Sequence, residues 1–179
     1  IANYSTENWI TSSPAVANGY VYIGSFDNNV YQLNASNISQ KIANYSTGGQ
    51  ISYSSPAIVN SYVYIGSMDN KIYQLNASNV SQQIANFSVS QGFGSSPAVA
   101  NGFVYIGNVD KQIYQLNASN ISQKIANFST GFQVRSSPAV ANGYVYIGSY
   151  DNKTYQLNAS NISQLIASYT TGNWIDSSP

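Results

Sequence analysis

The apolar residues of this chain fall in short runs separated by polar turns. Tyr20–Ile23 is a run of aromatic and β-branched residues that ends at Gly24, and Val30–Leu33 is a second run. Runs of this kind predict strands, because no apolar stripe at helical spacing continues for a useful length. Asn18-Gly19 and Asp27-Asn28 flank the first run and are hairpin-turn pairs. Adjacent positions of Tyr20–Ile23 are apolar, so both faces of this strand are predicted to be buried.

The pattern recurs along the whole chain. Ser-Ser-Pro ends at intervals of 42, 41, 41 and 41 residues, at Pro14, Pro56, Pro97, Pro138 and Pro179. A period of this length fits either paired helices or a four-stranded propeller blade, and the strand-like runs favour the blade. In the first unit the predicted strands are Ser13–Ala17, Tyr20–Ser25, Val30–Asn34 and about Lys41–Ser46.

The sequence therefore predicts an all-β chain, a β-propeller built of four-stranded antiparallel blades of about 41 residues. Residues 1–179 form a single repeat array with four blades, and the predicted pieces are units 12–53, 54–94, 95–135 and 136–176, an extra outer strand at 1–11 and a stub of a next unit at 177–179. Residues 1–14 and 166–179 are copies of one segment. We expect a window from a longer array, or half of an eight-bladed ring.

The repeat resembles the pyrroloquinoline-quinone-type (PQQ-like) propeller repeat. The resemblance rests on Ser13-Pro14-Ala15-Val16, Asn18-Gly19, the run Val21–Asp27 and the run Val30–Ala35, and it recurs in all four units. It is most similar to versions in archaeal cell-surface proteins. The family's outer-strand Trp is an alanine here, at Ala43, Ala85, Ala126 and Ala167. The resemblance implies a propeller, and the motif name is a repeat label that carries no cofactor.

Composition narrows the function classes. Charged residues make up 7% of the chain, against about 25% in an average protein, and six basic and six acidic side chains cancel. A neutral chain lacks the electrostatic footprint for nucleic acid or an anionic membrane surface, and no apolar run is long enough to span a bilayer. Cysteine and histidine are absent. We therefore expect no enzyme, no catalytic residue, no cofactor and no metal site.

One aspartate recurs in each second hairpin, at Asp27, Asp69, Asp110 and Asp151. Calcium needs six to eight oxygen ligands close together, and each unit supplies a single carboxylate. The sequence favours a role in the turns.

The sequon Asn-x-Ser/Thr is the densest functional signal. It recurs at three positions per unit, with further copies, at Asn3, Asn34, Asn37, Asn44, Asn76, Asn79, Asn86, Asn117, Asn120, Asn127, Asn152, Asn158 and Asn161. We expect N-glycosylation of at least some of these sites, since sugar would supply hydration that so few charges cannot. The alternative is that Asn and Ser only build turns.

The units differ most just before each Ser-Ser-Pro. The candidate partner-binding residues there are Trp9, Tyr53, Phe93, Arg135 and Trp174. Exposed aromatic residues in such loops stack on a sugar or a protein partner. The alternative is that they pack between blades in place of the missing Trp.

Three function hypotheses follow. The first is a non-catalytic extracellular structural or adhesive protein at a cell surface, glycosylated and assembled into a surface layer or filament through head-to-tail repeats or a homo-oligomer. The second is a carbohydrate- or protein-binding propeller module that uses the divergent loops. The third, a quinone-dependent dehydrogenase, fits worst because the ligands and acid–base groups that it needs are missing.

Overall fold

A computed structural model describes residues 2–179 of the chain. These residues form four antiparallel sheets of four strands each, and each sheet contains strands that follow one another in sequence. The sheets are called blades 1 to 4 below. Their strands are joined as consecutive hairpins, as expected for propeller blades.

The first three strands have equivalent bounds in all four blades, whereas the outer strand has 10 residues in blades 1 and 2 and 6 residues in blades 3 and 4. The short first strands are β1 (Ala15–Ala17), β5 (Ala57–Val59), β9 (Ala98–Ala100) and β13 (Ala139–Ala141). The second strands are β2 (Tyr20–Gly24), β6 (Tyr62–Gly66), β10 (Phe103–Gly107) and β14 (Tyr144–Gly148). The third strands are β3 (Asn29–Asn34), β7 (Lys71–Asn76), β11 (Gln112–Asn117) and β15 (Lys153–Asn158). The outer strands are β4 (Asn37–Ser46), β8 (Asn79–Ser88), β12 (Lys124–Ser129) and β16 (Leu165–Thr170).

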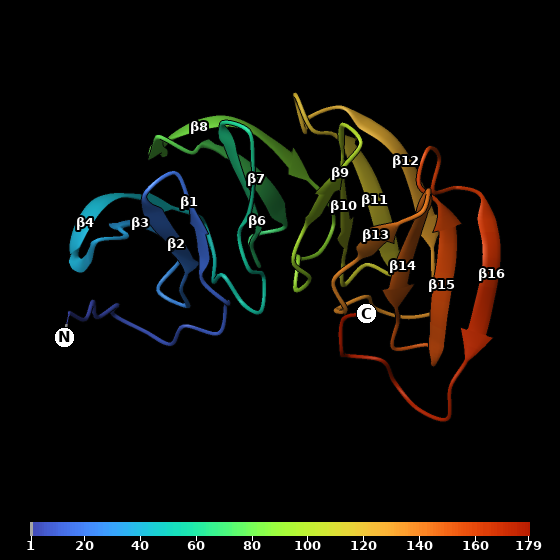
Figure 1. Ribbon diagram of the computed structural model, residues 1–179. Helices are drawn as coiled ribbons and strands as arrows, with labels where there is room; N and C mark the ends of the chain where they lie inside the picture. The colour runs from blue at the N-terminus through green and yellow to red at the C-terminus, as the bar shows by residue number, and fades with distance from the viewer. Residues whose placement is uncertain (1) are drawn as a thin grey trace.

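The blades stand side by side along an open arc, with blade 1 at one end and blade 4 at the other (Figure 1). The first strands line the inside of the arc, where β1 contacts β5, β5 contacts β9 and β9 contacts β13. One face of the arc, the turn face, carries the Asn18-Gly19 turn beside the turn at Ala35, whose N–H donates to the Gly19 carbonyl at 2.9 Å. The opposite loop face carries the Asp27 hairpin and the loops that enter each blade, where the Phe26 N–H donates to the Trp9 carbonyl at 2.9 Å.

A bulge shapes the outer strand of every blade. In blade 1, Gln32 pairs with Ala43 while Leu33 pairs with Lys41, so Ile42 is left without a partner residue. The same register shift recurs in the other blades. A bulge bends the strand and increases its twist. It also turns Ile42 to solvent, which explains why this apolar residue is exposed on the outer rim.

The cores lie between blades. Between blades 1 and 2, Tyr22 and Val30 of the first pack against Val63, Ile65 and Leu75 of the second, and all five side chains are fully buried. Equivalent clusters fill the space between blades 2 and 3 and between blades 3 and 4. A sheet buried on both faces needs apolar residues at adjacent positions, as the sequence predicts for Tyr20–Ile23.

An outer-strand aromatic residue of one blade packs on the third strand of the next blade. The ring of Tyr45 packs on Tyr73 of the next blade with centroids 5.3 Å apart, and Phe87 packs on Tyr114 at 5.5 Å. Such tilted pairs stabilise beyond their buried area by about 0.5–1.5 kcal/mol. The alanine that replaces the Trp, such as Ala43, therefore does not leave this interface without an aromatic anchor.

The extra outer strand predicted at 1–11 is wrong over the described part of that segment. Residues 2–11 contain no strand, and residue 1 lies outside the described residues. Tyr4 nevertheless packs on Tyr31 at 5.4 Å, the contact that Tyr45 makes with Tyr73. The segment takes the place of an outer strand but pairs with no strand among the described residues.

Candidate functional site

Each internal blade interface contains a buried polar clamp made by one tyrosine and one glutamine. Between blades 2 and 3, the Tyr64 hydroxyl donates to the Ala118 carbonyl at 2.6 Å, and the Gln74 Nε2 donates to the same oxygen at 3.1 Å. The Gln74 Oε1 accepts from the Ile121 N–H at 3.2 Å. The two side chains thus hold one turn of the neighbouring blade by both donor and acceptor groups. We call this arrangement the Tyr–Gln clamp and the turn that it holds the receiving turn.

The same clamp occurs at the other two interfaces. Tyr22 and Gln32 of blade 1 hold the turn at Ala77, and Tyr105 and Gln115 of blade 3 hold the turn at Ala159. Buried polar groups are tolerated when every one has a partner, and a complete network fixes one geometry. The clamp therefore sets the position of each blade relative to the next.

Burial changes the acidity of the clamp tyrosines. It raises the pKa of Tyr64 and of Tyr105 to about 12, and it raises the pKa of Tyr22 as well. The cause is desolvation, which disfavours the charged phenolate. These hydroxyls therefore remain protonated donors well above neutral pH.

The two ends of the arc carry the halves of a fourth clamp. In blade 4, Tyr146 and Gln156 occupy the clamp positions but are only half-buried, and they contact each other, with the Gln156 Nε2 donating to the Tyr146 hydroxyl at 3.4 Å. In blade 1 the receiving turn at Ala35 is exposed, whereas the equivalent Ala77 and Ala159 are buried. The two ends of the arc thus carry complementary parts of a clamp. These parts are more exposed than their equivalents at the internal interfaces.

Apolar residues around these two half-sites are also uncovered. Tyr169 of β16 is 73% exposed, although the equivalent Tyr45, Phe87 and Phe128 are half-buried against the next blade. At the other end Val16 is 68% exposed. Both end surfaces therefore present the side chains of a blade interface to solvent.

The recurring aspartates are turn residues. The Asp69 Oδ1 accepts from the Lys71 N–H at 3.2 Å, which is an Asx turn, and its Oδ2 accepts from the Tyr73 hydroxyl and from the Gly48 N–H at 2.7 Å. Burial, and after it the hydrogen bond from the hydroxyl to Asp69, raises the pKa of Tyr73. Asp27 and Asp151 make equivalent bonds. Within residues 2–179, no group of three or more His, Cys, Asp or Glu side chains is placed to hold a metal ion.

The divergent loops alternate between buried and exposed residues. Ile51, Phe93 and Val134 are fully buried, where they pack against the glycine that ends the second strand, such as Gly66 against Phe93. Phe93 therefore has to be removed from the candidate partner-binding residues, because it packs between blades. Trp9 and Trp174 remain, with 74% and 69% of their surface exposed.

The exposed aromatic residues form two groups on the loop face. Trp9 lies 6.1 Å from Phe26, and Phe26 meets Tyr53 edge-on at 6.4 Å. On the other side of the arc Tyr150 stacks on Trp174, with ring centroids 5.4 Å apart and planes 10° apart. The Arg135 guanidinium lies over the Tyr150 ring at 5.7 Å.

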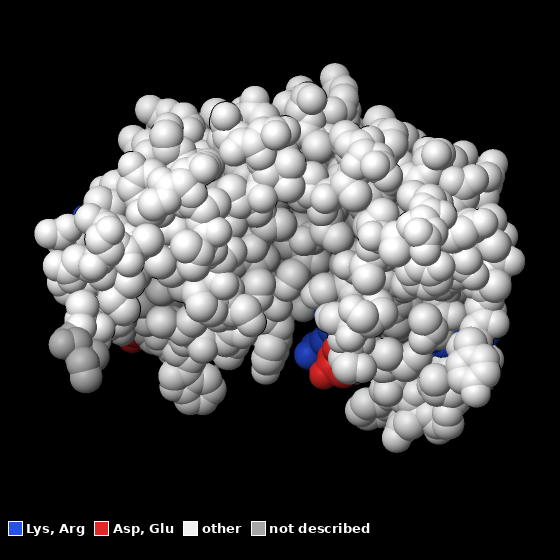
Figure 2. All heavy atoms as spheres, in the orientation of Figure 1, with Lys and Arg blue, Asp and Glu red and all other residues white. Residues whose placement is uncertain are grey.

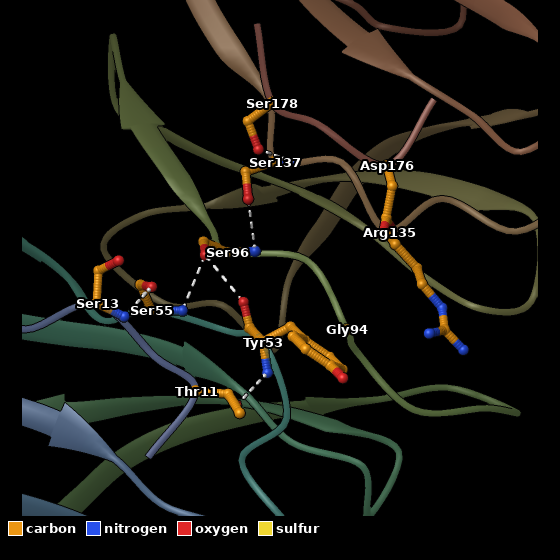
Figure 3. A pocket seen from close by; sticks show the side chains of 10 residues that line it. All are labelled: Thr11, Ser13, Tyr53, Ser55, Gly94, Ser96, Arg135, Ser137, Asp176 and Ser178. Atoms are coloured by element: carbon orange, nitrogen blue, oxygen red, sulfur yellow. Dashed lines mark hydrogen bonds between the residues drawn. The ribbon is translucent and has the colours of Figure 1, made fainter. Parts of the chain in front are cut away.

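A pocket of about 380 Å³, the central pocket, lies inside the arc on the loop face (Figure 3). It brings together residues from all five Ser-Ser-Pro segments, and its lining is Thr11, Ser13, Tyr53, Ser55, Gly94, Ser96, Arg135, Ser137, Asp176 and Ser178. The face of the molecule in Figure 2 carries few charged side chains, apart from one basic and one acidic group side by side at the notch in the middle. Among the five candidate partner-binding residues, the pocket contains Tyr53 and Arg135.

The three sequon positions of a unit differ in the state of the asparagine amide. At the end of the third strand the Asn76 Nδ2 donates to the Gln82 Oε1 at 2.9 Å, and on the outer strand the Asn44 Nδ2 donates to the Asn29 Oδ1 at 3.1 Å. At the turn-face position the Asn79 Oδ1 accepts from the Ser81 hydroxyl, and its Nδ2 has no partner among residues 2–179. The same holds for Asn37, Asn120 and Asn161.

Comparison with solved structures gives the fold. The chain is similar to BamB from Moraxella catarrhalis with a TM-score of 0.82 and 15% identity over 98% of this chain and 56% of that one. It is also similar to the computationally designed Ika8 protein, with a TM-score of 0.78 and 14% identity over 92% of this chain and 50% of that one. The similarity to the computationally designed Ika4 protein has a TM-score of 0.75 and 13% identity over 86% of this chain and 93% of that one. The chain thus spans about half the length of the first two structures. No protein-family model and no curated protein sequence matches it.

BamB is a β-propeller, so the similarity confirms the predicted all-β propeller of four-stranded antiparallel blades. None of the described residues forms a helix long and apolar enough to cross a membrane. At this level the chain is a propeller module.

The sequence prediction missed the clamp glutamines. Gln32, Gln74, Gln115 and Gln156 recur at one position in the middle of an otherwise apolar strand. A polar residue repeated there is a signal, because a buried amide is expected to have partners. Finding those partners requires the position of the neighbouring blade, which the sequence of one unit does not contain.

Proposed function

We propose that this chain is a non-catalytic structural propeller module of a cell surface, which joins head-to-tail to a second copy of itself. The observation that supports the proposal is the divided fourth clamp. Blade 4 presents Tyr146 and Gln156 without the receiving turn, and blade 1 presents the turn at Ala35 without the clamp. A second copy placed with its blade 1 against blade 4 would repeat the geometry of the three internal interfaces.

The same head-to-tail contact between copies can produce either of two assemblies. If the rotation between copies continues the arc, two half-length arcs close into a ring, and if it does not close, a filament or layer grows. A heterologous contact of this kind uses one surface on each partner, so every copy remains able to join another at its free end. This supports the adhesive or layer-forming role that the repeats suggest.

The first residues of the chain compete with this contact. Tyr4 lies on Tyr31, the position that Tyr169 of a second copy would take. The two segments are near-copies in sequence, so one has to move when copies join. We therefore expect association to be reversible and dependent on concentration.

A matched pair of variants tests the proposal. In sedimentation velocity over a range of concentrations, Tyr169→Ala weakens association by about three- to tenfold, since it removes one aromatic contact. Tyr4→Ala strengthens association, because it removes the competitor. A wild-type chain that remains a compact monomer at every concentration contradicts the proposal, as does an equal effect of both variants. Electron microscopy of native material then distinguishes rings from fibres.

N-glycosylation and an extracellular location belong to the same proposal. The turn-face asparagines Asn37, Asn79, Asn120 and Asn161 have a free amide nitrogen, so they are the sites that we expect to carry sugar. Their side chains remain accessible even where the adjacent turn is held by a clamp, as Asn120 shows. Intact mass and peptide mapping of native material test this. A mass equal to the bare polypeptide, or sugar found only at Asn34 and its equivalents, contradicts it.

A binding module is the second candidate function. The observation that favours it is the central pocket, in which residues that differ between the units converge. This role is compatible with assembly, because the pocket opens on the loop face and the clamps hold the turn face.

A further inference from the structure

The central pocket collects the positions at which the repeats differ. Immediately before the Ser-Ser of each Ser-Ser-Pro segment the five copies carry five different residues, which are Thr11, Tyr53, Gly94, Arg135 and Asp176. All five line the one pocket. The serines beside them are the same in every copy, so the shape of the wall is repeated while the chemistry of its inner surface changes from blade to blade.

The backbone of Tyr53, a residue of the pocket lining, is strained. Its φ angle is 63°, in the left-handed region that an aromatic residue rarely adopts. It lies in the one segment that is a residue longer than the others, and its N–H donates to the Thr11 hydroxyl at 3.2 Å. Its ring is 57% exposed. Strain of this kind is concentrated at functional sites.

Arg135 faces the same space from two blades further along the arc. Gly94 lies between Tyr53 and Arg135 (Figure 3), and an added Cβ at Gly94 would have the Arg135 side chain as its nearest neighbour, at 3.9 Å. The absence of a side chain there leaves a gap between an aromatic ring and a guanidinium. The Arg135 Nε makes one long bond, to the Gln133 Oε1 at 3.4 Å, and the guanidinium lies over the Tyr150 ring at 5.7 Å, so its other N–H groups have no hydrogen-bond acceptor among residues 2–179. Asp176 supplies the carboxylate of the pocket lining.

A row of serine hydroxyls forms the back of the pocket. The hydroxyl oxygens of Ser55, Ser96 and Ser137 each accept the N–H of the preceding copy's serine, at 2.8, 2.8 and 3.0 Å. A hydroxyl that accepts in this way keeps its own hydrogen to donate. For Ser55 and Ser137 no acceptor takes that hydrogen within residues 2–179. The pocket is therefore rich in unused donors.

We propose that the central pocket binds a carboxylated sugar, with Tyr53 stacked on the pyranose ring and Arg135 paired with the carboxylate. The donor-rich wall suits the acceptor oxygens of a polyol, and the guanidinium fork matches a carboxylate in a bidentate pair. A volume of about 380 Å³ is at the small end of ligand pockets, which suits one or two sugar rings. The hydroxyl-lined wall disfavours a lipid or an apolar peptide. This proposal is independent of head-to-tail joining.

Calorimetric titration with three probes tests the proposal on the full chain. The probes are methyl glucuronide, the uncharged methyl glucoside and acetate. We expect the glucuronide to bind about tenfold more tightly than the glucoside, because one charge-assisted pair is added. Acetate, which has no ring to stack on Tyr53, binds more weakly than either. No heat with the glucuronide at millimolar concentration, or equal binding of acetate, overturns the proposal.

Three variants locate the site. Arg135→Ala reduces glucuronide affinity to that of the glucoside and leaves glucoside affinity unchanged. Tyr53→Ala reduces the affinity for both sugars. Lys111→Ala is the control, since this cation lies over Phe132 outside the central pocket, and it changes neither. A glucuronide affinity that Arg135→Ala leaves unchanged, in a variant with an unchanged melting temperature, overturns the assignment.

Discussion

The interface between blades 3 and 4 and the free surface of blade 4 contain the same clamp in two states. Tyr105 and Gln115 are fully buried and hold the turn at Ala159. Tyr146 and Gln156, one unit later, are half-buried, and among residues 2–179 their side chains form hydrogen bonds only with each other. The side chains are identical, so the difference arises from the presence or absence of a neighbouring blade.

The comparison shows that each blade of this chain contributes one face to each of two interfaces, one with the blade before it and one with the blade after it. Its stability depends on what stands beside it, as in other repeat architectures, in which each unit is stabilised by its neighbours. One substitution distinguishes the two surfaces. Thr154 of blade 4 replaces Val30, Ile72 and Ile113, which are fully buried, and thus makes the free surface slightly more polar.

The largest expected effect comes from removing an engaged clamp glutamine. Gln115→Ala leaves the Ile162 N–H without its partner in a buried interface, and the Ala159 carbonyl loses one of its two donors and keeps the Tyr105 hydroxyl. We expect a loss of about 2–4 kcal/mol in the free energy of unfolding. Gln156→Ala, in a chain dilute enough to be monomeric, costs less than about 0.5 kcal/mol. Urea unfolding measures both losses. Equal losses would show that Gln156 is engaged with a partner, as Gln115 is.

A methyl group added at the end of the second strand gives the next largest effect. A Cβ at Gly107 would overlap with Val134, which is fixed between blades 3 and 4. Gly107→Ala is expected to destabilise the chain by about 1–3 kcal/mol. Gly148→Ala meets Ile175 in the same way, but no blade packs against Ile175 from the far side, so this segment moves aside at a smaller loss. The melting temperatures of the two variants test the difference. A larger decrease for Gly148→Ala than for Gly107→Ala would contradict it.

Alkaline pH provides a test of the engaged clamps. Burial raises the pKa of Tyr64 and Tyr105 to about 12, against about 10 in an unfolded chain. The folded state retains these protons to higher pH than the unfolded state. The clamp contribution is therefore complete below pH 10 and is lost as the pH rises from 10 to 12.

Urea midpoints measured from pH 9 upward, followed with phenolate absorbance, test this expectation. In Tyr105→Phe the decline is shallower, because one of the tyrosines whose pKa is raised by burial is removed. A decline that is already complete by pH 10, or one that the variant leaves unchanged, contradicts the role given to burial of these hydroxyls.

The smallest effect concerns the strained residue of the central pocket. Asparagine tolerates a positive φ better than tyrosine does, so Tyr53→Asn is expected to raise the free energy of unfolding by about 0.5–1 kcal/mol. Trp174→Asn is the control at an exposed aromatic residue whose φ angle is not positive, and it gives no gain. A loss of stability in Tyr53→Asn would show that the packing contacts of the Tyr53 ring stabilise the chain by more than its positive φ angle destabilises it.

The strands were largely predictable from the sequence. Tyr20–Ser25 was predicted where β2 spans Tyr20–Gly24, and Val30–Asn34 where β3 spans Asn29–Asn34. Local residue preferences and turn pairs determine these elements, so one unit contains the information. In blade 1 the outer strand begins earlier than predicted, at Asn37, because Asn37 also pairs with Asn34 across the turn, whereas the outer strands of blades 3 and 4 begin at Lys124 and Leu165, the positions equivalent to the predicted Lys41.

The site was less predictable for a physical reason. The divergent loops were found as loops, but the burial of Phe93 depends on its position between Gly66 of blade 2 and Ile106 of blade 3. The strand predicted for residues 1–11 failed for a related reason, since pairing needs a neighbour that the pattern of a single segment does not report. Only contacts between units decide these features.

Head-to-tail joining is tested most directly by mixing two single-cysteine chains. The chain has no cysteine of its own, so Gln156→Cys marks the clamp end and Ser36→Cys marks the receiving turn. With a short thiol cross-linker, a mixture of the two is predicted to yield cross-linked dimers, while each variant alone remains monomeric. Failure of the mixture to cross-link, or equally efficient cross-linking of Gln156→Cys with itself, would contradict the account.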